Sequence, residues 1–278
     1  GKTRTLNGFT SKQGKSFSAA IAFDEKYGFR DYRGGGRSSG RETIGRVAAG
    51  AVASKILKQL GIEVYAYASA IGGIELDNNN FSLAERDNNP FAMPDAKAAQ
   101  KIKEYADRKL EECNSMGGII ECVVENMPAG IGEPVFDKLD ANLAKAVMSI
   151  GAVKGVEIGD GFKAAQSTGL DNNDAFRMQD GRVVKKTNHS GGILGGISDG
   201  SDIILRAAIK PTPSIASVQQ TVNKQGEEID ISIHGRHDPM IVPRAVVVVE
   251  AMTAITLVDM LFTGMTSRLD RIADFYKR

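Results

Sequence analysis

The order of helix-like and strand-like segments is the feature that most constrains how this 278-residue chain can fold. Apolar residues at helical spacing predict helices at 39–60, 94–113, 137–148, 242–261 and 267–276. Strand patterns occupy 62–71, 117–125, 153–158 and 201–209, two more strands within 219–234 flank a turn at 224–227, and polar loops are expected at 77–93 and 159–181. Because helices and strands do not alternate in a regular βαβ rhythm, the order favours an α+β fold with antiparallel sheets over a doubly wound fold.

The segment 39–60 carries helix signals at both ends. Ser39 and Glu42 have the spacing of a capping box, in which two side chains satisfy backbone N–H groups at the helix start. Gly61 suits the position after the last turn, where a left-handed backbone is common. An apolar stripe at helical spacing consists of Ile44, Val47, Ala48, Ala51, Val52, Ile56 and Leu60.

Composition limits the classes of protein to which the chain can belong. Apolar residues make up 42%, enough for a sizeable core, and the length allows one large domain or two small ones. The net charge of +1 gives no overall attraction to nucleic acid or an acidic membrane, so any anion site must come from local clustering. The apolar run 245–261 contains Glu250 and Asp259, which predicts a buried core helix and no membrane span.

Cysteine usage bears on the cellular compartment. The two cysteines, Cys113 and Cys122, provide neither a metal-ligand spacing nor a disulfide framework. No signal peptide is recognisable, and we expect a reducing, cytoplasmic location and no metal site.

A concentrated positive patch lies within 26–46, a stretch that contains six basic residues and only two acidic ones. Its centre, 30–43, reads RDYRGGGRSSGRET and carries four arginines around a glycine triplet, directly before a predicted helix. Glycines allow a ligand to approach the backbone closely, and a helix start offers unpaired N–H groups. This pattern predicts a site for a phosphate or a carboxylate.

Two further glycine-containing regions combine backbone freedom with cationic or hydroxyl side chains, namely 188–200 with Lys210–Ser214, and 235–244. Such loops can line one polar pocket for anionic groups. The plainer interpretation of each glycine run is an ordinary turn, and the arginine–glycine stretch also resembles a disordered RNA-binding segment. A P-loop is excluded because its Gly-x-x-x-x-Gly-Lys-Ser/Thr pattern is absent, and 192–196 makes no convincing dinucleotide fingerprint.

The three histidines are His189, His234 and His237. His237 has the best claim to a functional role because it lies beside Arg236 and Asp238 in a polar loop. His189 is second, within a glycine-rich segment, and His234 has the pattern of a strand end. No Ser-His-Asp arrangement and no His/Cys/Glu metal cluster can be argued from the sequence.

The segments 27–39 (YGFRDYRGGGRSS), 41–43 and 46–52 resemble the central signature of the chorismate synthases. Similar blocks follow in family order at 128–140, 152–159, 188–200, 210–214 and 235–244. The resemblance runs from about Lys26 to the C-terminus. It implies one chorismate synthase-like domain over 1–278, a β–α–β sandwich fold and a homotetramer.

The resemblance also implies an activity. The family converts 5-enolpyruvylshikimate-3-phosphate to chorismate and phosphate in the shikimate pathway of aromatic amino acid biosynthesis. It requires reduced FMN (FMNH2) although the reaction has no net redox change. The sequence leaves open whether the protein reduces its own flavin with NADPH or uses an external reductant. No nucleic acid or membrane partner is implied.

Site residues are carried over by position. Asp238 matches an aspartate that assists proton transfer, and Arg41 and Arg236 match arginines that hold the anionic substrate. The flavin-contacting positions correspond to Arg37, Ser38, Ser39, Gly151, Ala152, Gly195, Lys210, Pro211, Thr212, Pro213, Ser214 and Arg236. Gly151 departs from the Asn or Pro that is more usual there. Several arginines suit a substrate with phosphate and carboxylate groups.

Two histidine motifs of the family, Thr-Phe-Gly-Glu-Ser-His-Gly and Gly-His-Ala-Asp, are not in this sequence. Their histidines are assigned acid roles toward reduced flavin and leaving phosphate. We expect joins at 6–7 and 23–24, where loops of a longer protein are missing. The alternative is a natural or engineered deletion, which leaves a catalytically impaired flavin-binding relative. An intact mass well above 29.7 kDa would favour the longer protein.

Overall fold

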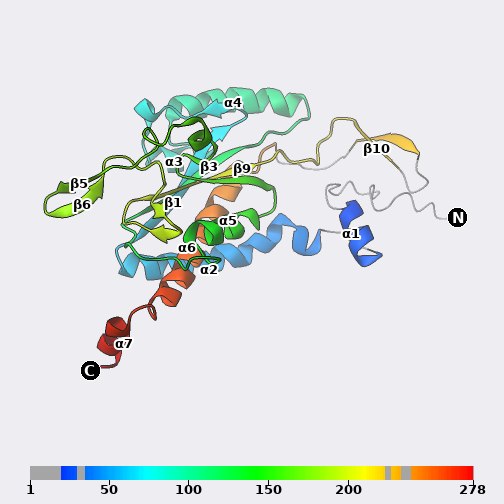
Figure 1. The fold of residues 1–278 in the computed structure, drawn as a ribbon. Coiled ribbons are helices and arrows are strands. Elements are labelled where there is room, and N and C mark those ends of the chain that lie inside the picture. The colour runs from blue at the N-terminus through cyan, green and yellow to red at the C-terminus, as the bar shows by residue number, and fades with distance from the viewer. Residues whose placement is uncertain (1–19, 30–34, 223–226, 233–238, 278) are drawn as a thin grey trace. The chain divides into compact units, whose positions relative to one another are not determined.

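The computed structural model describes residues 20–29, 35–222, 227–232 and 239–277 (Figure 1). Within them the chain forms two compact units. The first contains the described parts of Gly1–Glu42, Ser69–Gly118 and Ile209–Pro243, and the second contains Thr43–Ala68, Ile119–Ala208 and the described part of Arg244–Arg278.

The largest sheet has the strand order β2-β1-β3-β9-β4. Its strands are β1 (Glu63–Ile71), β2 (Ile74–Glu75), β3 (Gly118–Glu125), β4 (Val153–Ile158) and β9 (Ile203–Ile209). β1 and β2 form an antiparallel pair in which Ile71 faces Ile74. Three separate antiparallel hairpins pair β5 (Phe176–Gln179) with β6 (Arg182–Lys185), β7 (Ile193–Leu194) with β8 (Ile197–Ser198), and β10 (Gln219–Val222) with β11 (Glu228–Ile231). Helices mixed with antiparallel strands confirm the predicted α+β class.

The core of the second unit lies between the sheet and its helices. The helices that contribute buried side chains are α2 (Thr43–Gln59), α5 (Leu139–Met148) and α6 (Val242–Gly264, from Arg244 onward), whereas α7 (Leu269–Tyr276) contributes none. Alternate residues of β3, Ile120, Cys122 and Val124, are fully buried, as period-two alternation requires. The Sγ of Cys122 lies 3.7 Å from Oγ1 of Thr253, so this buried face of β3 packs against α6.

α2 and α6 approach each other closely at Gly50. A Cβ added to Gly50 would lie 2.3 Å from the Cβ of Ala251, which no packed pair of carbons tolerates. Glycine at this position is therefore required by the helix crossing itself.

The first unit is organised around α4 (Ala96–Glu111). Asp95 caps this helix, because its Oδ1 accepts hydrogen bonds from the backbone N–H groups of Lys97 and Ala98 at 2.9 and 3.1 Å. Its Oδ2 accepts a third from the N–H of Asp77 at 3.1 Å. The buried carboxylate thus joins the start of α4 to the loop that precedes it. That loop contains η3 (Asn78–Asn80) and α3 (Glu85–Asn88).

Several expectations need correction. The helix expected from residue 39 begins at Thr43 as α2, and residues 40–42 form the separate 3-10 turn η2 (Gly40–Glu42), which follows another, η1 (Gly36–Ser38). Its buried residues are Gly50, Ala53 and Leu57, whereas Ile44, Val52 and Leu60 of the apolar stripe are exposed. The loop at 77–93 is not wholly at the surface, because Phe91 and Met93 are buried. The loop at 159–181 contains η4 (Gly161–Gln166) and the strand β5.

α6 is long and apolar enough to cross a membrane by length and composition. More than half of its most apolar stretch is buried within the fold, including Val249, Ala254 and Leu257. The Oε2 of Glu250 on α6 accepts a hydrogen bond from the backbone N–H of Ala66 at 3.1 Å. These contacts are those of the core helix that the sequence predicts.

Candidate functional site

Within the arginine- and glycine-rich stretch 30–43, the described residues 36–42 form two consecutive 3-10 turns, η1 and η2, before α2 in the chain. The Ser38 hydroxyl donates to the carbonyl of Gly35 at 2.6 Å, and the Ser39 hydroxyl accepts from the N–H of Arg41 at 3.3 Å. The serines therefore shape the turns, while Arg37 and Arg41 are exposed. Each guanidinium is a planar set of donors suited to a phosphate or carboxylate.

Arg46, which belongs to the same positive patch, has a different environment. Its Nη1 donates to the hydroxyl of Ser149 at 2.6 Å and approaches Sδ of Met252 at 3.8 Å. Its guanidinium therefore links α2 to the end of α5 and to α6, which is a structural role.

The segment Lys210–Ser214 follows β9 in the chain. Ser214 is buried, and the carbonyl of Thr212 accepts a hydrogen bond from Ser115 Oγ at 2.6 Å. The hydroxyl Oγ1 of Thr212 is buried without a hydrogen-bond partner among the described residues. An unpaired buried hydroxyl costs free energy, about 1–3 kcal/mol, so this atom is a candidate for contact with a bound polar group.

Gly151 and Ala152 form the turn between α5 and β4. The N–H of Val153 donates to the carbonyl of Ile150 at 3.2 Å and closes the turn. Ala152 has a φ of 75°, a left-handed conformation that a residue with a Cβ rarely adopts. Strained backbone of this kind is often found at binding sites. Nothing lies within 4 Å of a Cβ built on Gly151.

Gly195 lies at the tip of the β7–β8 hairpin. Gly195 and Gly196 have φ angles of 58° and 85°, and positive values at both positions are what a two-residue type I′ hairpin turn needs. The carbonyl of Gly196 accepts from the N–H of Leu139 at 2.8 Å, so the tip contacts the first residue of α5. Gly151 follows the other end of that ten-residue helix, about 15 Å away by helix rise. The structure therefore places Gly195 and Gly151 near opposite ends of α5.

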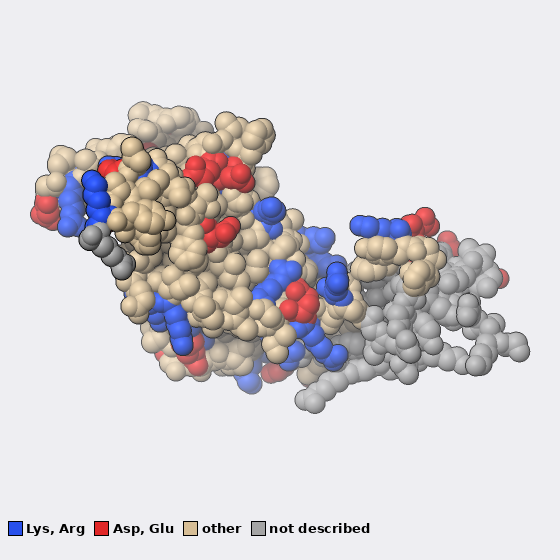
Figure 2. Space-filling view, turned by 90° about the horizontal axis from the view of Figure 1, so that it is seen from below, with Lys and Arg blue, Asp and Glu red and all other residues tan. Residues whose placement is uncertain are grey.

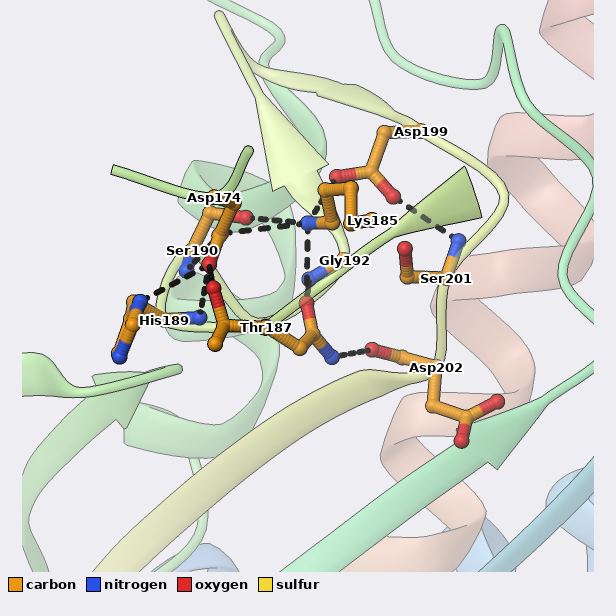
Figure 3. Close-up of polar contacts among 10 residues, drawn as sticks. Asp174, Lys185, Thr187, His189, Ser190, Gly192, Asp199, Ser201 and Asp202 are labelled. Atoms are coloured by element: carbon orange, nitrogen blue, oxygen red, sulfur yellow. Dashed lines mark hydrogen bonds and ion pairs between the residues drawn. The ribbon is translucent and has the colours of Figure 1, made fainter. Parts of the chain in front are cut away.

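A buried polar cluster lies beside this hairpin (Figure 3). The Nζ of Lys185 lies 2.7 Å from Oδ2 of Asp199 and 3.4 Å from Oδ2 of Asp174. The three side chains are only 4%, 8% and 5% exposed, respectively. Ion pairs so deeply buried require good geometry and further hydrogen bonds to offset the loss of hydration.

Backbone donors complete the environment of Asp174. Its Oδ1 accepts from the N–H of His189 at 2.8 Å, and its Oδ2 accepts from the N–H of Ser190 at 3.0 Å. Burial alone would raise the pKa of Asp174, but these hydrogen bonds outweigh it and hold the pKa well below its usual range. The Nδ1 of His189 lies 2.9 Å from Asp174 Oδ1 without meeting hydrogen-bond geometry.

The sequence pattern does not predict this cluster. His189 is a candidate from the sequence, but Asp174, Lys185 and Asp199 are not, because the region lacks periodicity and charged loop residues are ordinarily solvated. The one available signal was the position of Lys185 three residues before Asn188, at the start of a glycine-rich run.

A second missed group lies on the sheet. The Tyr65 hydroxyl donates to Glu125 Oε1 at 2.7 Å, and the Tyr67 hydroxyl hydrogen-bonds Glu121. Burial, and then the neighbouring carboxylates, raise the pKa of both tyrosines above the ordinary value. Both phenols are therefore protonated donors throughout the physiological pH range.

Some sequence-predicted residues fall outside the described residues. They are Arg236 and Asp238 of the candidate site, together with Arg30, Arg33, His234 and His237. The described candidates lie in four separate segments, with Arg37, Ser38, Ser39, Arg41 and the Lys210–Ser214 run in the first unit and Gly151, Ala152 and Gly195 in the second.

The surface carries charges of both signs. The face drawn in Figure 2 carries Lys and Arg together with Asp and Glu side chains, as expected for a net charge of +1. The fold and the described segments together define a class, an α+β protein with cationic and glycine-rich loops chemically suited to small anionic ligands.

Known proteins identify the family. A family model for chorismate synthase matches residues 15–262. Chorismate synthases of Lachnospira eligens and Archaeoglobus fulgidus are 68% identical over 260 residues and 53% identical over 247 residues. The matched residues cover 94% and 87% of this chain, and 71% and 69% of those proteins. A crystal structure of chorismate synthase matches with a TM-score of 0.73 at 31% identity, covering 92% of this chain and 75% of that one.

The chain therefore belongs to the chorismate synthase family and is a carbon–oxygen lyase.

Proposed function

We propose that the protein catalyses the anti-1,4-elimination of phosphate from 5-enolpyruvylshikimate-3-phosphate to give chorismate, with reduced FMN bound. Family membership supports the reaction. The observation that supports the cofactor assignment is the buried hydroxyl of Thr212, which has no hydrogen-bond partner among the described residues and lies in a segment that resembles a flavin-binding one.

The fit of the chain to FMN can be argued from the donors present. FMN offers ring carbonyls and nitrogens, ribityl hydroxyls and a phosphate, all of which pair with hydroxyl, backbone N–H or cationic groups. Thr212 has a buried hydroxyl that no described group hydrogen-bonds, and Arg37 is an exposed cation. Gly195 presents backbone with nothing within 4 Å of its added Cβ, so a planar ligand could approach it. These residue types fit the group.

The reaction itself sets what the side chains must do. The C–O bond to phosphate and a ring C–H bond both break and a C=C bond forms, so electrons balance without net oxidation. Bound reduced FMN would supply an electron-rich environment for loss of the phosphate. We assign Arg41 and Arg236 to the anionic groups of the substrate, where guanidinium also stabilises charge on the departing phosphate. Asp238 is assigned to moving the ring proton.

Several properties complete the proposal. We infer from the family resemblance that all 278 residues form one domain and that the protein assembles as a homotetramer in the cytoplasm. NADPH or an external reductant would keep the flavin reduced. Cys113 and Cys122 are both free thiols, which suits a reducing compartment.

The alternative is a flavin-binding relative with impaired catalysis. It is favoured by one observation, the absence from this sequence of the two histidine motifs of the family. Intact mass separates the two readings, because a mass well above 29.7 kDa would show that the protein contains further segments.

The test is anaerobic incubation of the purified protein with substrate and chemically reduced FMN. Chorismate and phosphate should appear in equal amounts, and oxidised FMN should support neither. Tight FMN binding without product would reject the proposed reaction and favour the impaired relative. Salt-sensitive RNA binding without flavin binding would reject both readings.

A further inference from the structure

The β7–β8 hairpin that carries Gly195 has two legs, 188–192 and 199–201, and both are tied to the same polar cluster. In the first leg, Asn188 Oδ1 accepts from the N–H of Gly192 at 2.8 Å. In the second leg, Asp199 Oδ1 accepts from the N–H of Ser201 at 2.9 Å. The legs also meet directly, through the N–H of Asp199 and the carbonyl of Gly192 at 3.0 Å.

Lys185 bonds to both legs through one ammonium group. Its Nζ donates to Asn188 Oδ1 at 3.0 Å and to Ser190 Oγ at 2.7 Å in the first leg. It donates to Asp199 Oδ2 at 2.7 Å in the second leg. Figure 3 shows this convergence, with the ammonium at the centre of the dashed contacts. Lys185 is the last residue of β6, so its backbone is fixed by pairing with Phe176 of β5.

Charge balance makes this ammonium hard to replace. Two carboxylates, those of Asp174 and Asp199, lie almost wholly buried around a single lysine. A neutral side chain at 185 would remove the one lysine or arginine that pairs with these carboxylates among the described residues, which is strongly unfavourable in a buried site. A cluster held together only by hydrogen bonds between neutral groups would not require a positive charge at residue 185.

We propose that Lys185 is a positioning residue, which holds the two legs of the β7–β8 hairpin together and thereby fixes Gly195 for contact with the flavin. The assignment of Gly195 to the flavin rests on the proposed function. The holding of the legs rests only on the contacts above. The role is distinct from catalysis because Lys185 is buried and acts through Asn188, Ser190 and Asp199.

The experiment compares Lys185→Gln, Lys185→Arg and the matched control Lys186→Gln, which changes the exposed neighbouring lysine. Amide hydrogen exchange is measured at Gly192 and Ser201, and affinity for oxidised FMN is measured by titration. In Lys185→Gln, exchange at both amides should rise, and the Kd for FMN should rise roughly tenfold, by analogy with the loss of affinity when residues that orient metal ligands are removed. Lys185→Arg, which keeps the charge, should retain most of the amide protection and most of the FMN affinity. Lys186→Gln should match the wild type in both measurements.

Asp199→Asn provides a second route if Lys185→Gln does not fold. It leaves Lys185 paired with Asp174, so exchange should rise at Ser201 while His189 and Ser190 stay protected. Unchanged exchange at Ser201 in this variant, or at both amides in Lys185→Gln, would overturn the holding role. Faster exchange with an unchanged Kd for FMN would overturn the positioning role. A wild type that binds no FMN would reject the proposed function, and the exchange data would still decide whether Lys185 holds the legs.

Discussion

At the scale of single residues, the exposed arginines and the buried Lys185 show how one type of charge can have opposite uses. Arg37 and Arg41 keep their guanidinium groups exposed on short turns, where an anion can reach them. Lys185 is surrounded by four protein acceptors and has no capacity to spare. Whether a cationic side chain can bind a ligand or has a structural role therefore depends on its burial and its hydrogen-bond partners, and not on whether it is lysine or arginine.

The role of Arg41 can be tested by substitution with alanine. Loss of a charge-assisted contact to the substrate should raise KM by roughly tenfold or more, equivalent to about 1.5–3 kcal/mol. Steady-state kinetics with varied substrate measure this change, and Arg46→Ala serves as a contrast because Arg46 contacts Ser149. An unaltered KM in Arg41→Ala would remove this residue from the substrate site.

Asp238 calls for an isosteric change because its proposed role is proton transfer. Asp238→Asn should keep FMN and substrate affinity while kcat falls by roughly 10²-fold or more. Single-turnover measurements under anaerobic conditions would isolate this step. Turnover equal to that of the wild type would exclude Asp238 from the mechanism.

At the scale of elements, the crossing of α2 and α6 determines the packing of the second unit. Gly50→Ala would place a Cβ 2.3 Å from that of Ala251, so it should destabilise the fold by about 1–3 kcal/mol. Gly45→Ala on the same helix has nothing within 4 Å and should be neutral or stabilising, by up to about 1 kcal/mol. Urea unfolding of both variants measures the difference. Equal stabilities would show that α2 and α6 do not pack as described.

Sequence patterns predicted the bounds of helices and strands better than they predicted which face of a helix is buried. β1, β3 and β4 lie within two residues of their expected bounds, because short apolar runs and the glycines that flank them are local signals. The buried face of α2 was not predictable from its stripe, since it is set by the close contact of Gly50 with α6, some two hundred residues away in the chain. Small residues carry this contact, and a hydrophobic pattern does not distinguish them.

The candidate site also has parts that the sequence predicts and parts that it does not. Segments rich in arginine and glycine could be found because their composition is unusual. The cluster of Lys185, Asp174 and Asp199 could not, because its members meet only after two hairpins have formed. The roles of Arg236 and Asp238 come from family resemblance and stay predictions.

At the scale of the whole molecule, buried carboxylates predict how stability depends on pH. Burial opposes ionisation of Asp95, Asp174 and Asp199, yet hydrogen bonds to each outweigh it and lower the pKa in the folded state. Each therefore stabilises the fold above the unfolded pKa of about 3.9 and loses that contribution as pH falls through the folded value. Asp202, which is exposed, works in the opposite direction, because partial desolvation and the nearby carboxylate of Glu125 raise its pKa.

The free energy of unfolding should therefore decline as pH is lowered below about 4, because the lowered pKa values of Asp95, Asp174 and Asp199 together outweigh the raised pKa of Asp202. Urea denaturation between pH 7 and pH 3 measures it. Asp199→Asn, which cannot titrate, should show a shallower decline over the same range. A variant whose stability falls as steeply as that of the wild type would show that Asp199 does not contribute in this way.

The central claim is that reduced flavin is required for the elimination but is not consumed by it. The most direct measurement is the amount of chorismate formed per reduced FMN under strict exclusion of oxygen, with flavin absorbance followed in the same cell. We expect many chorismate molecules per flavin and a flavin that is still reduced at the end. Oxidation of one flavin for each chorismate, or equal turnover with oxidised FMN, would contradict it.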